Sequence, residues 1–195
     1  EPNNACINNG LLTLHGEVKP HCQAPRGTQS LKCHAGSVLY DKRLMTYGEV
    51  TIRARFPNQG TKGIDFKPVV MLWTDNNDWL GGVEYDIAEV FDAGAQSYES
   101  FANYLDPVST TTRPSKATIK TERIPVDPAS FNDYGFRWTP YAVEYLLNKQ
   151  VILRIPADAH PNAVSHQPHR LTLQVDSDSV PDSRTPRRFI TVSSR

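Results

Sequence analysis

Three carboxylates stand close together in one short stretch, GGVEYDIAEVF, which covers positions 81 to 91. Glu84, Asp86 and Glu89 lie among apolar residues that otherwise have the pattern of a β-strand. Burying an unpaired carboxylate costs several kcal/mol, and like charges at this spacing disfavour one another. An ordinary core strand would avoid this arrangement, whereas a cleft that performs acid–base chemistry needs it.

Side-chain alternation separates the three acids unless the strand is irregular. Successive strand residues point to opposite faces, so Glu84 and Asp86 share one face while Glu89 falls on the other. One extra residue, a β-bulge, would return Glu89 to the face of the other two acids. We therefore predict a bulge near Ile87 or Ala88 and three carboxylates on one wet face.

This arrangement suits the cleavage of a glycosidic bond. In a retaining glycosidase two carboxyl groups lie about 5–5.5 Å apart, and one attacks the anomeric carbon while the other protonates the departing oxygen. An acid between them would hydrogen-bond the nucleophile and raise its neighbour's pKa by charge repulsion, which separates the two roles at one pH.

The elements that must position this strand are also β-strands. About ten short β-rich stretches recur along the chain, no convincing amphipathic helix interrupts them, and Pro and Gly fall mostly between them. We expect Asn148 and Lys149 to form a hairpin turn, and segments 106–130 and 155–170 to be surface loops. This pattern predicts an all-β fold of two packed antiparallel sheets or a jelly roll.

Length and composition limit the remaining choices. The chain has 195 residues without an internal linker, so we expect a single domain over 1–195. Lys and Arg together number 21, as do Asp and Glu, which indicates no nucleic-acid partner. No apolar run approaches the ~20 residues of a membrane span. Neither an initiator Met nor a signal sequence is present, so we expect a processed or trimmed chain.

Three cysteines, Cys6, Cys22 and Cys33, lie near the start of the chain and lack the spacing of a zinc site. Cys22 and Cys33 flank a loop between strand-like segments, where a disulfide would stabilise the fold by ~2–3 kcal/mol. We expect this bridge, which would indicate an oxidising, extracellular location. Two alternatives stay open: Cys6 pairs with one of the others, or all three are reduced in a cytosolic protein.

The residues around the acids resemble glycoside hydrolase family 16. EYDIAE matches the family's ExDxxE signature in its β-bulged form. AGSVLYDKRLMTYGEVTIRARF resembles the family's upstream SGR-then-YGRVEAR segment, and FNDYGFRWTPYAVEYLLNKQVI resembles its downstream FHTYGFEWTPDSIRWYVDGQLV segment. The resemblance runs from about Asn9 to near the C-terminus. It implies a concanavalin-like β-jelly roll, with two curved antiparallel sheets and a substrate cleft on the concave face.

The resemblance also implies roles for single residues. Glu84 takes the position of the nucleophile, Asp86 that of the assisting carboxylate, and Glu89 that of the general acid/base. Trp79 matches an aromatic of the bulged members and would stack on a sugar, although an ordinary core or rim Trp fits equally well. Arg53 matches the Arg of YGRVEAR and lies on the wet face of its strand, where it would bind substrate or stay a solvated arginine.

The chain departs from the family at several positions. Asn103 stands where the family has a cleft His, and Lys67 and Met71 stand at two aromatic positions, one of which often stacks on sugar. We expect Asn103 and Lys67 to contact substrate. Lys67 beside Arg53 would suit a glycan with carboxylate or sulfate groups, although a solvated lysine is the simpler interpretation. The family's opening strand is missing, or residues 1–6 supply a degenerate one.

We therefore predict a secreted, monomeric, endo-acting β-glycan hydrolase that retains anomeric configuration. Its default substrate is a polysaccharide, β-1,3- or mixed-linkage glucan, followed by a modified or charged galactan. A non-catalytic carbohydrate-binding jelly-roll module and a wall-glycan transglycosylase are the alternatives. We expect no metal and no cofactor, because the histidines clustered in one loop have no convergent carboxylates near them; these are His160, His166 and His169.

Overall fold

The computed structural model describes residues 4–16, 37–57, 66–77, 82–90, 96–106, 115–177 and 188–193, and these form two antiparallel sheets. Sheet A has the order β1 (Ala5–Asn8), β2 (Leu11–Gly16), β14 (Arg188–Ser193), β4 (Gly48–Arg55), β10 (Asn132–Thr139), β11 (Ala142–Leu147) and β12 (Gln150–Pro156). Sheet B has the order β3 (Ser37–Met45), β13 (His169–Ser177), β5 (Phe66–Thr74), β6 (Glu84–Glu89), β7 (Ser97–Asp106) and β8 (Ser115–Lys120). The short β9 (Ile124–Pro125) pairs with β7, and a 3-10 turn, η2 (Pro161–Ala163), precedes β13.

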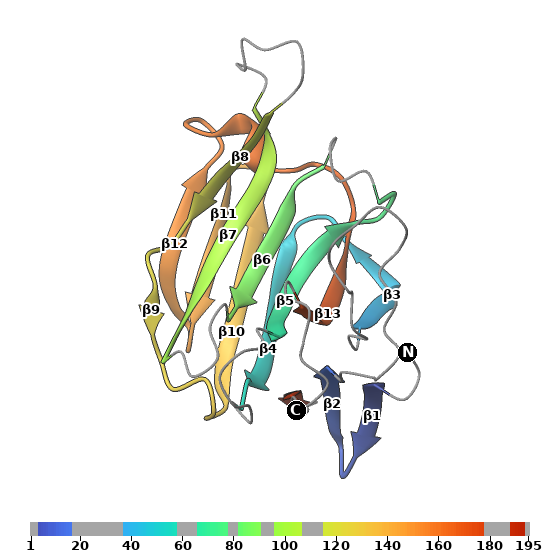
Figure 1. The fold of residues 1–195 in the computed structure, drawn as a ribbon. Helices are drawn as coiled ribbons and strands as arrows, with labels where there is room; N and C mark the ends of the chain where they lie inside the picture. Colours follow the sequence, from blue (N-terminus) through green and yellow to red (C-terminus); the bar gives the residue numbers. More distant parts are fainter. Residues whose placement is uncertain are drawn as a thin grey trace, which may run out of the picture.

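The hydrophobic core lies between the two sheets, which pack face to face (Figure 1). Alternate residues of β10, Tyr134, Phe136 and Trp138, point inward and are fully buried. The ring of Tyr85 on β6 lies 4.8 Å from that of Phe136, and the ring of Tyr98 on β7 lies 5.1 Å from that of Tyr134. These aromatic contacts join the strand that carries the acids to the opposite sheet.

The predicted hairpin turn is confirmed. Asn148 and Lys149 connect β11 to β12 with φ values of 48° and 70°. Positive φ at both central residues is the geometry of a type I′ turn, whose twist matches the flanking strands.

The prediction of surface loops was partly wrong. Segment 106–130 contains β8 and β9, which pair with β7. The sequence of β8, SKATIK, did not indicate a strand, because its outward-facing positions are polar. Within segment 155–170, Ala163 and Val164 are buried in the core, and the Tyr85 hydroxyl donates to the Ala163 carbonyl at 3.1 Å.

The N-terminal residues supply an edge strand. β1 pairs with β2 at the edge of sheet A, in the place where a degenerate opening strand was one of the expectations. Cys6 on β1 is exposed and forms no disulfide with a described residue. Cys22 and Cys33 lie outside the described residues. In the part of the chain that the structure describes, no helix is long and apolar enough to cross a membrane.

Candidate active site

The predicted β-bulge is present in β6. Toward β5, Ala88 pairs with Val70 and Asp86 pairs with Met71. Within these described strands Ile87 is therefore one residue too many, and the register shifts there. Toward β7 the register also shifts between Asp86 and position 89. The bulge prediction is confirmed.

The bulge turns two consecutive residues inward. Ile87 and Ala88 are 2% and 0% exposed and both belong to the core, which regular alternation would forbid. The Ser100 hydroxyl donates to the Ile87 carbonyl at 2.7 Å, which satisfies a backbone acceptor that the irregular ladder exposes. Glu84 and Glu89 both remain half-buried.

One amide connects two of the acids. Asn103 on β7 lies directly across from Glu84, and its Nδ2 donates to Glu84 Oε2 at 3.1 Å and to Asp86 Oδ2 at 3.3 Å. The Thr118 hydroxyl on β8 donates to Asn103 Oδ1 at 2.8 Å. Two carboxylates and an oriented amide thus form one hydrogen-bonded group.

Asp86 has a strongly perturbed acidity. Burial raises the pKa of this carboxyl well above its ordinary value, the charges of Glu84 and Glu89 raise it further, and Lys116 opposes them. Asp86 is itself only 2% exposed. It is therefore held toward its neutral form, which reduces repulsion within the triplet.

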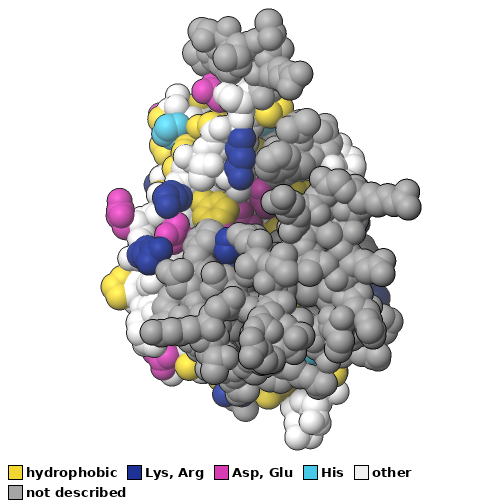
Figure 2. Space-filling model, viewed as in Figure 1, with side chains coloured by type: hydrophobic (Ala, Val, Ile, Leu, Met, Phe, Trp, Pro, Cys, Tyr) yellow, Lys and Arg dark blue, Asp and Glu magenta, His cyan; other side chains and the backbone are white. Residues whose placement is uncertain are grey.

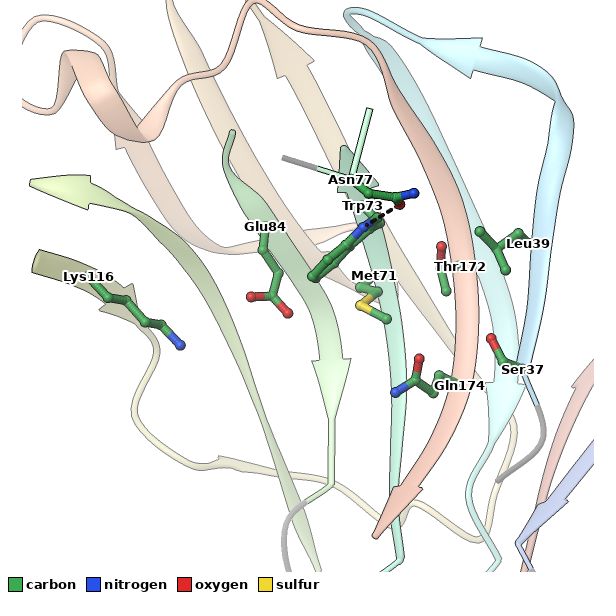
Figure 3. Close-up of a pocket in the computed structure, with 9 residues that line it drawn as sticks. All are labelled: Ser37, Leu39, Met71, Trp73, Asn77, Glu84, Lys116, Thr172 and Gln174. Atoms are coloured by element: carbon green, nitrogen blue, oxygen red, sulfur yellow. Dashed lines mark hydrogen bonds between the residues drawn. The ribbon is translucent and has the colours of Figure 1, made fainter. Parts of the chain in front are cut away.

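A pocket of about 440 Å³ opens beside Glu84 on the outer face of sheet B. In Figure 3 the Trp73 ring lies beside the Glu84 carboxylate, with Met71 next to it on the same strand. Trp73 Nε1 donates to Asn77 Oδ1 at 3.0 Å, which fixes the indole. The other lining residues come from β3, β13 and β8: Ser37, Leu39, Thr172, Gln174 and Lys116.

The pocket is also lined by the buried side-chain hydroxyl of Thr172. Thr172 is 4% exposed, and its Oγ1 has no hydrogen-bond partner among the described residues. A buried hydroxyl that faces a pocket is suited to bind a polar ligand group.

Cationic side chains border the acids on the β7 and β8 side. Lys120 Nζ and Arg123 Nε lie 2.9 and 3.5 Å from the carboxylate of Glu99, which faces Glu89 across the strands. Lys116 of β8 points toward Glu84 in Figure 3. Figure 2 shows Lys and Arg side chains gathered around acidic ones over this region of sheet B.

The floor beneath the acids is rigid and buried. The Tyr145 hydroxyl donates to the Phe101 carbonyl at 2.8 Å, and the Tyr85 hydroxyl accepts from the Ser165 N–H at 2.7 Å. His169 Nε2 lies 2.6 Å from the carbonyl oxygen of Val83, the residue before the first acid. The start of β6 is thus held to the core.

The expectation that Arg53 binds substrate is wrong. Arg53 does lie on the wet face of its strand, but β4 belongs to sheet A, and the core separates that outer face from the acids of sheet B. Its guanidinium instead pairs with Asp133 at 3.2 Å. Lys67 is half-buried on β5, in sheet B, so it does not lie beside Arg53. Trp79 lies outside the described residues.

Several pocket residues were not identified from the sequence. Alternation along KPVVMLW places Trp73 on the same face as Met71, so the pattern contained a signal for this aromatic. Lys116 and Thr118 lie on a strand that the sequence pattern suggested was a loop. Thr172 had no local signal, because β13 reaches β5 through a pairing between distant segments.

No protein-family model matches the chain, and a search of curated proteins finds no match. Among solved structures, the endo-1,3-beta-glucanase (laminarinase) catalytic domain of Thermotoga petrophila aligns with a TM-score of 0.71 and 20% identity, over 97% of this chain and 77% of that one. A glycoside hydrolase family 16 endo-glucanase from Bacteroides ovatus gives 0.69 and 13%, over 99% and 86%. This chain has the fold of glycoside hydrolase family 16.

A third structure widens the range of activities found with this fold. It comes from work on endo-acting O-glycanases that human gut bacteria express to initiate mucin breakdown, and it aligns with a TM-score of 0.72 and 18% identity over 98% of this chain and 76% of that one. The predicted jelly roll is therefore confirmed. Among the described residues no group of three His, Cys, Asp or Glu side chains is arranged to hold a metal ion.

Proposed function

We propose that this chain is an endo-acting hydrolase of β-glycans that retains anomeric configuration. The observation that carries the proposal is the bulge, which allows Glu89 to share the outer face of sheet B with Glu84 and Asp86, beside an open pocket. β-1,3- or mixed-linkage glucan is the default substrate, because laminarinases and an endo-glucanase share this fold.

The proposed reaction proceeds by double displacement. Glu84 attacks the anomeric carbon while Glu89 gives its proton to the departing glycosidic oxygen, so the glycosidic bond breaks as a glycosyl ester forms. Glu89 then takes a proton from water, the water oxygen bonds to the anomeric carbon, and the electron pair of the ester bond returns to Glu84. Asp86, held toward its neutral form, limits the repulsion between the charged groups around it.

The pocket supports the binding of a sugar ring beside the nucleophile. The fixed indole of Trp73 offers an apolar face for the C–H groups of a pyranose, and the Thr172 hydroxyl offers a buried polar contact. Lys67 and Trp79 remain candidate substrate contacts from the sequence resemblance.

A panel of polysaccharides tests the proposal. The protein should release oligosaccharides with new reducing ends from at least one β-glycan, and NMR during the first turnovers should show the product with the β-configuration of the substrate. Initial release of the α-anomer would contradict the retaining mechanism. Binding without cleavage would favour a carbohydrate-binding module, and chain transfer in place of hydrolysis would favour a transglycosylase.

A charged glycan is the second candidate substrate, because basic side chains lie close to the acids of sheet B. Lys120 and Arg123 are 57% and 63% exposed at the cleft margin, and Lys116 lines the pocket itself. Exposed ammonium and guanidinium groups are suited to sulfate or carboxylate substituents. Faster hydrolysis of a sulfated or carboxylated polymer than of its desulfated or carboxyl-reduced form would assign this substrate class.

We further propose that the protein is secreted, contains a Cys22–Cys33 disulfide and acts as a monomer. The support is the position of these cysteines around one loop. Thiol titration of denatured, unreduced protein should find one free thiol, contributed by the exposed Cys6. Three free thiols would contradict the disulfide and remove the main argument for secretion. Gel filtration at micromolar concentration should give the mass of one chain.

A further inference from the structure

The side chain of Asn103 is fully engaged by protein groups. An amide has two N–H donors and one carbonyl oxygen. Both contacts of Nδ2 are to carboxylates, Glu84 at 3.1 Å and Asp86 at 3.3 Å, and Oδ1 accepts from the Thr118 hydroxyl at 2.8 Å. Asn103 is also only 4% exposed. This differs from the expectation that Asn103 binds sugar.

We propose that Asn103, oriented by Thr118, is a positioning residue that fixes the side chain and the charge of Glu84. The proposal rests on the function proposed above, in which Glu84 is the nucleophile. Thr118 and Asn103 together are called the amide relay below. The relay acts through Glu84 and Asp86, and it does not require that either of its members touch the substrate.

The Glu84 carboxylate and the Thr118 hydroxyl together favour one orientation of the amide. In the observed orientation the NH2 group faces two carboxyl groups, while the carbonyl oxygen faces a hydroxyl donor. The flipped orientation would aim the amide oxygen at the Glu84 carboxylate, where acceptor faces acceptor. In the observed orientation the Thr118 hydroxyl satisfies the amide oxygen, which faces away from the acids. The hydroxyl on β8 therefore helps to hold a donor on the acids of β6.

A donor on Glu84 favours its ionised form. A donated hydrogen bond stabilises the negative charge of a carboxylate, whereas the neighbouring carboxylate of Glu89 repels that charge. Other charged or titratable groups lie around Glu84 and Asp86, on β6 itself and on the strands that pack against it. In the described part of the chain these groups are Glu89, Glu99, Lys116, Lys120, Lys67 and Tyr145. Within this field the relay supplies a neutral donor at the nucleophile itself.

The relay also acts in the second half of the reaction. When the bond between the anomeric carbon and Glu84 breaks, the carboxylate regains its negative charge. A fixed N–H donor stabilises that charge as it develops, so the relay should aid departure of the carboxylate from the glycosyl ester. The donor is already oriented before the step and needs no rearrangement.

Matched variants of the exposed Thr118 test the relay. Thr118→Val keeps the shape of the side chain and removes the hydroxyl, while Thr118→Ser keeps the hydroxyl and serves as the control. Because position 118 is exposed, both variants should fold, which circular dichroism and thermal melting would verify. Asn103→Ala removes the donor altogether and gives the upper limit of the effect.

On a cleaved polysaccharide, Thr118→Val should lower kcat about 2- to 10-fold, the range for one lost hydrogen bond between neutral groups, with little change in KM. Asn103→Ala, which removes the donor to a charged group, should lower kcat about 10- to 100-fold. The acidic limb of the kcat/KM profile should move to higher pH, because Glu84 loses a donor that favours its charged form. Thr118→Ser should keep the parent's values. A raised KM with unchanged kcat would make Asn103 a sugar ligand and overturn the proposal.

A second measurement does not depend on activity. In protein labelled with 13C at carboxyl carbons, the Glu84 resonance, assigned by its loss in Glu84→Gln, should titrate at higher pH in Thr118→Val than in the parent. An unchanged titration would overturn the relay even if kcat fell. If the parent cleaves no glycan at all, the proposed function fails, while this titration still decides whether the relay holds Glu84.

Discussion

The outer faces of the two sheets both carry charged side chains, but they arrange these charges in opposite ways. On sheet A, acids and bases stand opposite one another across neighbouring strands. They form four ion pairs among the described residues: Arg53–Asp133, Arg137–Glu49, Arg137–Glu144 and Arg154–Glu144. Register and charge are matched along this face, as in a surface arranged for stability.

On sheet B the corresponding positions bring like groups together. Glu89 faces Glu99 across the strands, and Asp86 lies close enough to Glu84 to share one amide donor. Such a surface costs stability, and the cost is concentrated where a pocket opens. The comparison shows that the charges of sheet A pair strand with strand, whereas the clustered acids of sheet B suit the chemistry proposed for them.

The largest expected effect is on sheet B, at the proposed nucleophile, Glu84. Glu84→Gln should lower hydrolysis of every substrate by more than about 10⁴-fold, because neither a better leaving group nor a different pH replaces the attacking carboxylate. The folded protein should be no less stable, since the change removes a charge from a repulsive cluster. The measurement is the initial rate on polymer and on an aryl glycoside. Parental activity in this variant would end the glycosidase proposal.

Glu89→Ala should have a smaller effect that depends on the substrate. Polymer hydrolysis should fall about 10²- to 10⁴-fold, because the leaving oxygen is no longer protonated. An aryl glycoside with a good leaving group should still form the glycosyl ester, and added azide should restore turnover by replacing the activated water. The rate and product of the azide reaction check this. The same azide rescue in Glu84→Gln would mean that the two roles are reversed.

Asp86→Asn should reduce activity less, about 10- to 100-fold, because Asp86 tunes its neighbours and does not bond to sugar. Its effect on stability should depend on pH. The raised pKa means that folded Asp86 binds its proton more tightly than the unfolded chain does, so the parent loses stability as the pH rises above about 4 toward that pKa. Asparagine does not titrate. As the pH rises, the melting temperature of the variant should therefore increase relative to that of the parent. A difference in melting temperature that does not change with pH would contradict the raised pKa.

Glu144→Gln tests the opposite behaviour on sheet A. Burial tends to raise the pKa of this carboxyl, but hydrogen bonds from Arg154 and Arg137 lower it overall. The change should cost about 1 kcal/mol of unfolding free energy at neutral pH, without loss of activity. The cost should vanish as the pH falls through the lowered pKa, since the protonated parent has lost the charge as well. Urea unfolding at pH 7 and pH 3 measures both values.

Arg53→Ala should have the smallest effect. The exposed pair with Asp133 contributes little, so the unfolding free energy should change by less than about 0.5 kcal/mol. KM and kcat on the best substrate should stay at the parent's values, because the core lies between Arg53 and the acids. Lys116→Ala, on sheet B, provides the matched comparison. A raised KM in Arg53→Ala would return this arginine to the substrate site.

The sequence predicted those features that depend on neighbours along the chain. Alternation in VEYDIAEV broke at Glu89, and one inserted residue repaired it, so the bulge followed from local counting. The Asn148–Lys149 turn likewise depends on two adjacent residues.

Features that depend on pairing between distant segments were not predictable. The wet face of β4 was correctly identified, but alternation does not say to which sheet a strand belongs, and this placed Arg53 in the wrong site. Asn103 was expected to bind substrate because it stands where the family has a cleft His, and its register with Glu84 and its contact with Thr118 depend on strand pairing that the sequence does not specify. The fold resolves both by fixing which strands are neighbours.

The bulge in β6 has a consequence for how such a site arises in a gene. Removing one codon, that of Ile87 or Ala88, would take out the extra residue, and the strand that remains would alternate regularly with all three acids still on its outer face. Glu89 would then stand one position closer to Glu84 along the chain. A change of three nucleotides at this point can thus alter the spacing between the acids without turning any of them into the core.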